Sequence, residues 1–217
     1  WVQYKNSKPS TQLDDKNADG KVDTTLTYQS DGEQPERLEE DTNFDGKPDR
    51  ITTYDNGAVA AIEADKDHSR RPDVHARFNS DGSKSAEEQD TTGDGKDDAA
   101  IYYENDVQVR LEEDTTGDGK KDVVTFFEAG VIAKKRADTT GDGHFDRVAR
   151  YQDGIERTQI QDEDGDGRPE RVVHLDVDGK MEREEIDSSG DGKANLFRFY
   201  AAGKRVREEE DSDGDWD

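Results

Sequence analysis

The chain has 217 residues, with 56 Asp and Glu against 31 Lys and Arg, a formal net charge of -25 and only 28% hydrophobic residues. A globular domain of this length normally carries nearer half apolar residues, so a thick hydrophobic core is excluded. The strong negative charge excludes general attraction to nucleic acid. No apolar run approaches the roughly 20 residues of a membrane helix. The lack of Cys excludes disulfides and thiolate metal sites.

The acidic residues recur at a fixed period, which a disordered acidic segment would not show. Variants of the pattern D-x-x-x-D-G-x-x-D begin at steps of 24 to 26 residues, at Asp15, Asp41, Asp65, Asp90, Asp114, Asp138, Asp162 and Asp187. Asp211-Ser-Asp213-Gly-Asp215 opens a ninth loop. We therefore interpret 1–217 as a single repeat array with eight full repeats and partial repeats at both ends, and expect it to be a fragment of a longer chain.

Each repeat predicts a β-hairpin. Strand-like runs rich in β-branched and aromatic residues, such as 123–127 and 196–200, lead to turn pairs such as Asn56-Gly57 and Asp153-Gly154. More polar strands such as 131–135 follow the turns. A large apolar residue, aromatic in seven of the eight repeats, lies thirteen residues after each first Asp. We expect this ladder to supply most of the apolar packing.

Three repeats, beginning at Asp15, Asp65 and Asp162, contain one extra residue between the large apolar residue and the turn glycine. An insertion inside a strand would turn every later side chain to the other face, so we place it in the turn. The predicted fold is all-β: tandem hairpin repeats of about 24 residues forming an elongated antiparallel meander of about sixteen strands, because short links favour neighbouring antiparallel strands. A β-solenoid and a curled open barrel are the alternatives.

The loops carry oxygen ligands in the pattern that a hard cation requires. Positions 1, 3, 5 and 9 carry carboxylate, amide or hydroxyl groups, position 6 is Gly except at Arg70, and a basic residue at position 7 offers its backbone carbonyl. We expect six strong sites and two poorer ones, because Ser69 and Arg70 weaken the third loop and Asn195 weakens the eighth, and thus about six to eight Ca²⁺ ions. The predicted metal ligands are Asp15, Asn17, Asp19, Lys21, Asp23, Asp41, Asn43, Asp45, Lys47, Asp49, Asp65, Asp67, Asp73, Asp90, Thr92, Asp94, Lys96, Asp98, Asp114, Thr116, Asp118, Lys120, Asp122, Asp138, Thr140, Asp142, His144, Asp146, Asp162, Asp164, Asp166, Arg168, Glu170, Asp187, Ser189, Asp191, Lys193 and Asn195.

The spacing matches the start of an EF-hand loop, but the glutamate at position 12 and the flanking helices are missing. The loops more closely resemble the nonhelical D-x-D-x-D-G-x-x-D loops of thrombospondin type 3 repeats, integrin-type propeller hairpins and bacterial calcium-binding acidic repeats. Those families are extracellular and use calcium structurally, which this resemblance implies here too. The departures are the absent thrombospondin-type cysteines and a repeat too short for a propeller blade.

Calcium would also reduce the self-repulsion of the chain, because eight divalent ions carry sixteen positive charges and change the formal charge from -25 to -9. The first expected function is a noncatalytic, calcium-stabilised spacer or scaffold of a larger secreted or cell-surface protein, bacterial surface or periplasm included. The alternatives are a calcium-dependent adhesion module that binds glycan, protein or mineral, and a calcium store. The four histidines share no spacing, so we expect no enzyme.

Overall fold

The structure is a computed structural model that describes residues 1–211, so the predicted ninth loop, with Asp213 and Asp215, lies outside the described residues. All 18 strands of the described residues belong to one antiparallel sheet. No helix in the described part of the chain is long and apolar enough to cross a membrane.

The chain divides into two compact units, Trp1–Gln108 and Val109–Asp217. The first unit contains β1 (Val2–Lys5), β2 (Lys8–Asp14), β3 (Thr24–Tyr28), β4 (Pro35–Glu40), β5 (Arg50–Asp55), β6 (Ala58–Ala64), β7 (Val74–Phe78), β8 (Lys84–Gln89) and β9 (Ala99–Glu104), and the boundary falls within β10 (Val107–Glu113). The second contains β11 (Val123–Glu128), β12 (Val131–Ala137), β13 (Arg147–Gln152), β14 (Ile155–Gln161), β15 (Arg171–Leu175), β16 (Met181–Ile186), β17 (Leu196–Ala201) and β18 (Lys204–Glu210).

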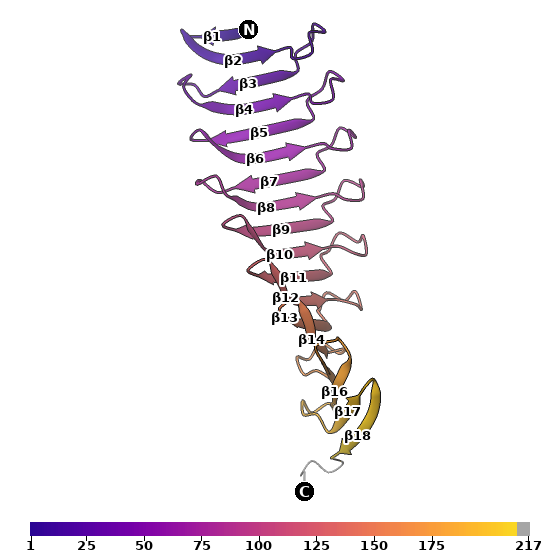
Figure 1. Cartoon of the computed structure of the whole chain (residues 1–217). Helices are drawn as coiled ribbons and strands as arrows, with labels where there is room; N and C mark the ends of the chain where they lie inside the picture. The colour runs from indigo at the N-terminus through magenta and orange to yellow at the C-terminus, as the bar shows by residue number, and fades with distance from the viewer. Residues whose placement is uncertain (212–217) are drawn as a thin grey trace. The chain divides into compact units, whose positions relative to one another are not determined.

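Strands that follow one another in the chain pair antiparallel, and the sheet is open. This confirms the predicted all-β hairpin meander, in place of the parallel coils of a β-solenoid. The sixteen strands expected from eight repeats are β3 to β18, and β1 with β2 forms a further hairpin in the partial first repeat. Within the first unit, Figure 1 shows the hairpin turns at one end of the strands and the acidic loops at the other.

The two-residue hairpin turns adopt the conformation that the sequence predicts. Asn56 and Gly57 have φ angles of 49° and 81°, and Asp153 and Gly154 have φ angles of 53° and 76°. Two consecutive positive φ angles define a type I′ turn, whose twist matches that of the flanking strands. Ala129 and Ala202, with φ of 50° each, adopt the same conformation without the side chain that normally favours it.

The three inserted residues lie in the turns. In the repeat that begins at Asp15, for example, Gln29 N–H donates to the carbonyl of Gln34, and Gly32 N–H donates to the carbonyl of Gln29, so a longer turn absorbs the extra residue. The register also shifts by one residue just before the turn in eight hairpins of the described chain, as between Phe126 and Phe127. This bulge determines which side chains share a face of the sheet, because opposite residues in an antiparallel pair lie on the same face.

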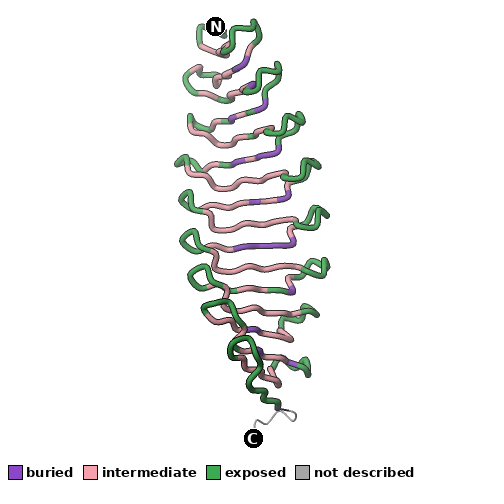
Figure 2. The backbone as a smooth tube through the Cα atoms, turned by 45° about the vertical axis from the view of Figure 1, so that its right-hand side comes forward, coloured by how far each residue is buried: buried purple, intermediate pink, exposed green. Residues whose placement is uncertain are grey.

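Burial is concentrated at the strand ends next to the acidic loops, as the purple segments of Figure 2 show. One buried strand position carries small side chains: Val173 is 2% exposed, and Thr52, Thr125 and Ala76 occupy the same repeat position in other repeats with 4% to 6% exposure. The large apolar residues before the turns are only half-buried. The small residues beside the loops are therefore more completely buried than the predicted aromatic ladder.

Candidate metal centre

The first carboxylate of each loop holds the loop closed. In all eight loops its oxygen accepts the backbone N–H of position 6, with distances from 2.6 Å for Gly46 to Asp41 up to 3.1 Å for Gly167 to Asp162. The position-6 glycines have positive φ, for example 90° at Gly95. Glycine adopts this backbone conformation at little cost, which explains the recurring Asp-Gly pair.

Two versions of the loop differ in the residue at position 3. Where position 3 is Asn or Asp, its side-chain oxygen accepts the N–H of position 5, as Asn17 does from Asp19 at 2.9 Å. Where position 3 is Thr or Ser, position 4 is glycine and donates its N–H to the first carboxylate, as Gly117 does to Asp114 at 2.6 Å. Both versions use short polar side chains to close the turn.

The acid at position 5 also accepts a backbone hydrogen bond, from the N–H of position 7, at 2.8 Å between Asp118 and Lys120. Ser69 takes this place in the third loop, with a longer distance of 3.3 Å from Arg71 N–H to the Ser69 hydroxyl. A carboxylate oxygen has more than one acceptor direction, so one backbone bond leaves capacity for a cation. These bonds therefore fix the positions of the acids without using all of their oxygen lone pairs.

The side chain at position 9 connects the end of each loop to its start. Asp98 accepts N–H hydrogen bonds from Thr91 at 2.7 Å and Thr92 at 2.8 Å, and a hydroxyl bond from Thr91 at 2.9 Å. In the other loops the position-9 side chain likewise accepts the N–H of position 2. The six aspartates at this position are 4% to 9% exposed, so position 9 has a structural role in addition to any ligand role.

The position-2 hydroxyl was not among the predicted site residues. Thr42, Thr91, Thr115, Thr139 and Ser188 each donate this hydroxyl to the position-9 side chain. The signal in the sequence was the recurring hydroxyl residue directly after the first Asp, as in the Asp-Thr-Thr runs at 90–92, 114–116 and 138–140. Its recurrence at one position indicates a partner within the loop.

Several of the basic residues at position 7 reach the following loop. The Arg71 guanidinium lies over Gly95, where a Cβ on residue 95 would come within 2.5 Å of it, and the Arg168 side chain lies over Gly192 in the same way. Lys21 approaches Gly46 similarly. At Gly95 and Gly192, glycine therefore both adopts the positive φ and leaves room for the arginine side chain of the preceding loop.

Three of the described loops bring three carboxylates together, each with one oxygen within 4.8 Å of the others. These clusters are Asp65, Asp67 and Asp73; Asp90, Asp94 and Asp98; and Asp162, Asp164 and Asp166. The other five described loops do not gather three carboxylates at this separation, and all five have Asn, Thr or Ser at position 3. The third loop, which we expected to be weak, is among the three.

The donor set of these clusters fits a hard cation, since it consists of carboxylate oxygens with acceptor capacity remaining, and each cluster includes at least one exposed acid. Two carboxylates 4.8 Å apart repel each other by about 0.9 kcal/mol even in a water-like dielectric. A divalent ion would reverse this repulsion. These three clusters could therefore hold metal ions.

Hydrogen bonding favours the charged form of several loop acids. The Thr91 hydroxyl lowers the pKa of the Asp98 carboxyl, burial raises it, and the N–H groups of Thr91 and Thr92 lower it further, for a net downward shift. Burial raises the pKa of Asp114, but the N–H groups of Gly119 and Gly117 and the Thr116 hydroxyl bring it below its usual value. These acids remain ionised, which a metal ligand must be.

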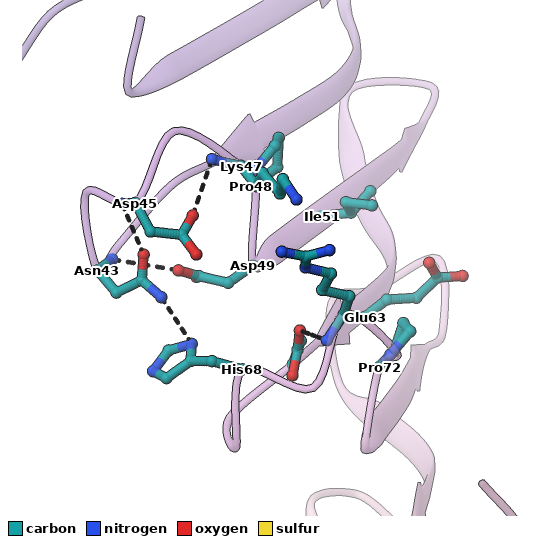
Figure 3. Close-up of a pocket in the computed structure, with 11 residues that line it drawn as sticks. Asn43, Asp45, Lys47, Pro48, Asp49, Ile51, Glu63, His68 and Pro72 are labelled. Atoms are coloured by element: carbon teal, nitrogen blue, oxygen red, sulfur yellow. Dashed lines mark hydrogen bonds between the residues drawn. The ribbon is translucent and has the colours of Figure 1, made fainter. Parts of the chain in front are cut away.

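A pocket of about 350 Å³ lies between the second and third loops of the first unit (Figure 3). Asn43 Nδ2 donates to His68 Nδ1 across it at 2.9 Å, so the two loops are linked directly. Asp45, Asp65 and Arg70 are also in its lining. Because acidic and basic side chains line it together, the pocket does not favour either an anionic or a cationic ligand.

In comparisons with known proteins, no family model matches the chain, and no curated protein matches it.

Proposed function

We propose that the chain is a noncatalytic calcium-stabilised repeat module that serves as a structural spacer or scaffold of a larger extracellular or cell-surface protein. The observation that carries the proposal is the convergence of three carboxylates in the loops that begin at Asp65, Asp90 and Asp162. The resemblance to calcium-binding acidic repeats supports calcium as the ion, and the all-oxygen donor set suits it. The loops that carry Asn, Thr or Ser at position 3 would complete their sites with those oxygens.

Stabilisation by metal follows from how little else opposes the loop charges. The buried apolar residues are few and small, and the acids sit where consecutive hairpins join. An ion that binds only the folded loops adds its binding free energy to the free energy of unfolding. For a dissociation constant of about 1 mM, typical of extracellular modules, 10 mM calcium would add about 1.4 kcal/mol per site.

The test is a thermal melt followed by circular dichroism, in chelator and in increasing calcium, together with calorimetric titration. We expect the midpoint to rise with calcium and magnesium to be less effective. The proposal would be contradicted if chelator left the melting midpoint unchanged and calorimetry detected no heat of calcium binding.

A pair of variants separates site binding from general charge relief. Asp166→Asn removes one carboxylate from the seventh-loop cluster but keeps a side-chain oxygen that can accept the Arg168 N–H. In the unsubstituted chain this hydrogen bond, from Arg168 N to Asp166 Oδ1, is 2.7 Å long. Asp153→Asn makes the same charge change at a hairpin turn, where asparagine suits the φ of 53°. The calcium-dependent rise should shrink in Asp166→Asn alone, and an equal reduction in both variants would mean that calcium acts only by screening.

A further inference from the structure

One face of the second unit carries unneutralised positive charge at the centre of three adjacent strands. Opposite residues across β11, β12 and β13 place Phe126 beside Lys134 and Lys134 beside Arg150, and the next row places Val124 beside Arg136 and Arg136 beside Val148. Opposite residues, and alternate residues of one strand, lie on the same face. We call this surface the cationic face: Val124, Phe126, Lys134, Arg136, Val148 and Arg150.

The repeat pattern shows that the cationic face is a local departure. The residue equivalent to Arg136 is acidic in six of the other seven repeats, and Ile160 is the remaining exception. The six acids are Glu39, Glu63, Glu88, Glu112, Glu185 and Glu209. The acidic row on this side of each hairpin is therefore interrupted at two consecutive repeats in a chain whose net charge is -25.

Elsewhere the cations of the equivalent rows are paired with these glutamates. Arg37 contacts Glu39 at 2.9 Å, and Arg183 contacts Glu185 at 3.1 Å. In contrast, Lys134, Arg136 and Arg150 form no ion pair with any residue that the structure describes. Two of these cations lie over rings instead: Lys134 Nζ lies 5.8 Å from the Phe126 centroid, and the Arg136 guanidinium lies 4.3 Å from the Phe145 centroid.

The Lys134 and Arg150 pair is unfavourable for the sheet itself. Like charges that face each other directly across an antiparallel pair destabilise it. The equivalent pairs in other hairpin junctions, such as Arg37 with Thr53 and Arg183 with Phe199, place only one cation there. An anion bound between the two cations would turn this repulsion into attraction.

We propose that the cationic face binds a linear anionic polysaccharide carrying sulfate or carboxylate groups. The face is an open sheet surface with charges spaced by neighbouring strands, about 4.8 Å apart, so it suits an extended chain of separate anionic groups. The half-buried Phe126 adds an apolar ring beside the cations, against which the C–H face of a sugar can pack. The proposal goes beyond the spacer function and does not depend on which ion fills the loops.

The net charge of the chain decides between polysaccharide and nucleic acid. Nucleic acid carries one charge per about 1.7 Å of duplex, and the acidic loops would repel such a dense polyanion strongly. A polysaccharide with one charge per one or two sugars experiences less of that repulsion. An acidic peptide remains as an outcome of the test.

The experiment titrates the calcium-loaded chain with fluorescent oligosaccharides of chondroitin sulfate and, separately, of hyaluronan, which carries only carboxylates. Neutral dextran, poly-glutamate and single-stranded oligo-dT are the comparison ligands. We expect one or both anionic oligosaccharides to bind more tightly than all three, with affinity that falls as salt rises.

Lys134→Gln and Lys135→Gln provide a matched pair, because these adjacent β12 residues face opposite sides of the sheet. Lys134→Gln and Arg150→Gln should each weaken binding about threefold, and the double variant about tenfold, as expected for exposed charge contacts. Lys135→Gln should leave the affinity for the oligosaccharide unchanged within the experimental error.

Three results would overturn the proposal: equal loss in Lys134→Gln and Lys135→Gln, no binding of either oligosaccharide, or tighter binding of poly-glutamate or oligo-dT. A fourth result would also overturn it: oligosaccharide binding that is abolished by Asp166→Asn but unchanged by Lys134→Gln. That pattern would mean calcium bridges the polymer to the loops. Circular dichroism of every variant checks that the fold is kept.

Discussion

The backbone N–H of Thr91 donates a 2.7 Å hydrogen bond to the Asp98 carboxylate, joining the second and ninth positions of one acidic loop. The same connection recurs in all eight described loops, and in the eighth loop Asn195 makes it with an amide oxygen. The position-9 side chain therefore has a function that needs an acceptor oxygen but no charge. This separates its role from that of the acid at position 5.

We predict that Asp98→Ala destabilises the chain even in chelator, by about 1–3 kcal/mol, because it leaves the N–H groups of Thr91 and Thr92 without their acceptor. Asp98→Asn should cost less, as Asn195 makes the same contact naturally. Asp94→Ala loses one exposed bond to Lys96 N–H and should have the smallest effect in chelator. Denaturant unfolding in chelator measures all three, and equal losses would contradict the assignment.

The effect of a substitution on calcium binding should depend on the ligand at position 5, independently of its effect on stability in chelator. We predict that Asp118→Ala lowers the calcium-dependent rise in melting temperature more than Ser69→Ala does. Asp118 offers a carboxylate at position 5, whereas Ser69 offers only a hydroxyl, which contacts the Arg71 backbone. Calorimetric titration of both variants gives the number of ions lost. Equal effects would show that position 5 is not a ligand.

The sequence predicted the strands, the turns and the loop frame because these depend on local chemistry that recurs with the period. Asn56-Gly57, for example, prefers the type I′ turn wherever it occurs. It did not predict the faces of the sheet. The register shift between Phe126 and Phe127 places Phe127 opposite Ile132 and leaves Phe126 beside Lys134. The two adjacent aromatic residues thus lie on opposite faces of the sheet, and their partners on β12 were identified only from the strand pairing.

The candidate sites were similarly predictable in part. The acids at positions 1, 5 and 9 were identified from their spacing, but spacing does not say how far each oxygen is already used. Asp98 shares one oxygen among three donors, while Asp94 accepts a single bond. Such bonds depend on how the loop closes on itself, which composition does not encode.

Arg70 stands where seven loops have glycine, with φ of 76°. A residue with a Cβ is strained by about 1–2 kcal/mol in this left-handed region. We predict that Arg70→Gly stabilises the calcium-free chain by about 1 kcal/mol, since part of the gain is offset by the greater freedom of glycine when unfolded. A denaturant melt checks the sign. Arg71→Gly, at a neighbouring position without this strain, is the control and should not stabilise.

Glu184 should make stability depend on acid pH independently of the loops. Its side chain lies in the sheet with the residue 3% exposed, and it accepts hydrogen bonds from Arg171, Arg198 and Tyr200. Burial raises the pKa of Glu184, but Arg171 and then Tyr200 and Arg198 lower it below its usual value. A depressed carboxyl pKa stabilises the folded chain above the unfolded pKa, about 4.3, and this contribution is lost as pH falls through the folded pKa.

Glu184→Gln should therefore cost about 1–3 kcal/mol at pH 7, because it removes charge-assisted hydrogen bonds to two arginines. The difference from the unsubstituted chain should shrink below about pH 4.3, where the carboxyl of the unfolded chain begins to bind a proton, and should be lost as pH falls through the lower pKa of the folded carboxyl. Denaturant unfolding in chelator from pH 7 to pH 3 measures it. Glu185→Gln, on the opposite face with a side chain 24% exposed, is the control and should cost less. A Glu184→Gln deficit that stays constant across this range would show that the charge of Glu184 contributes nothing to stability.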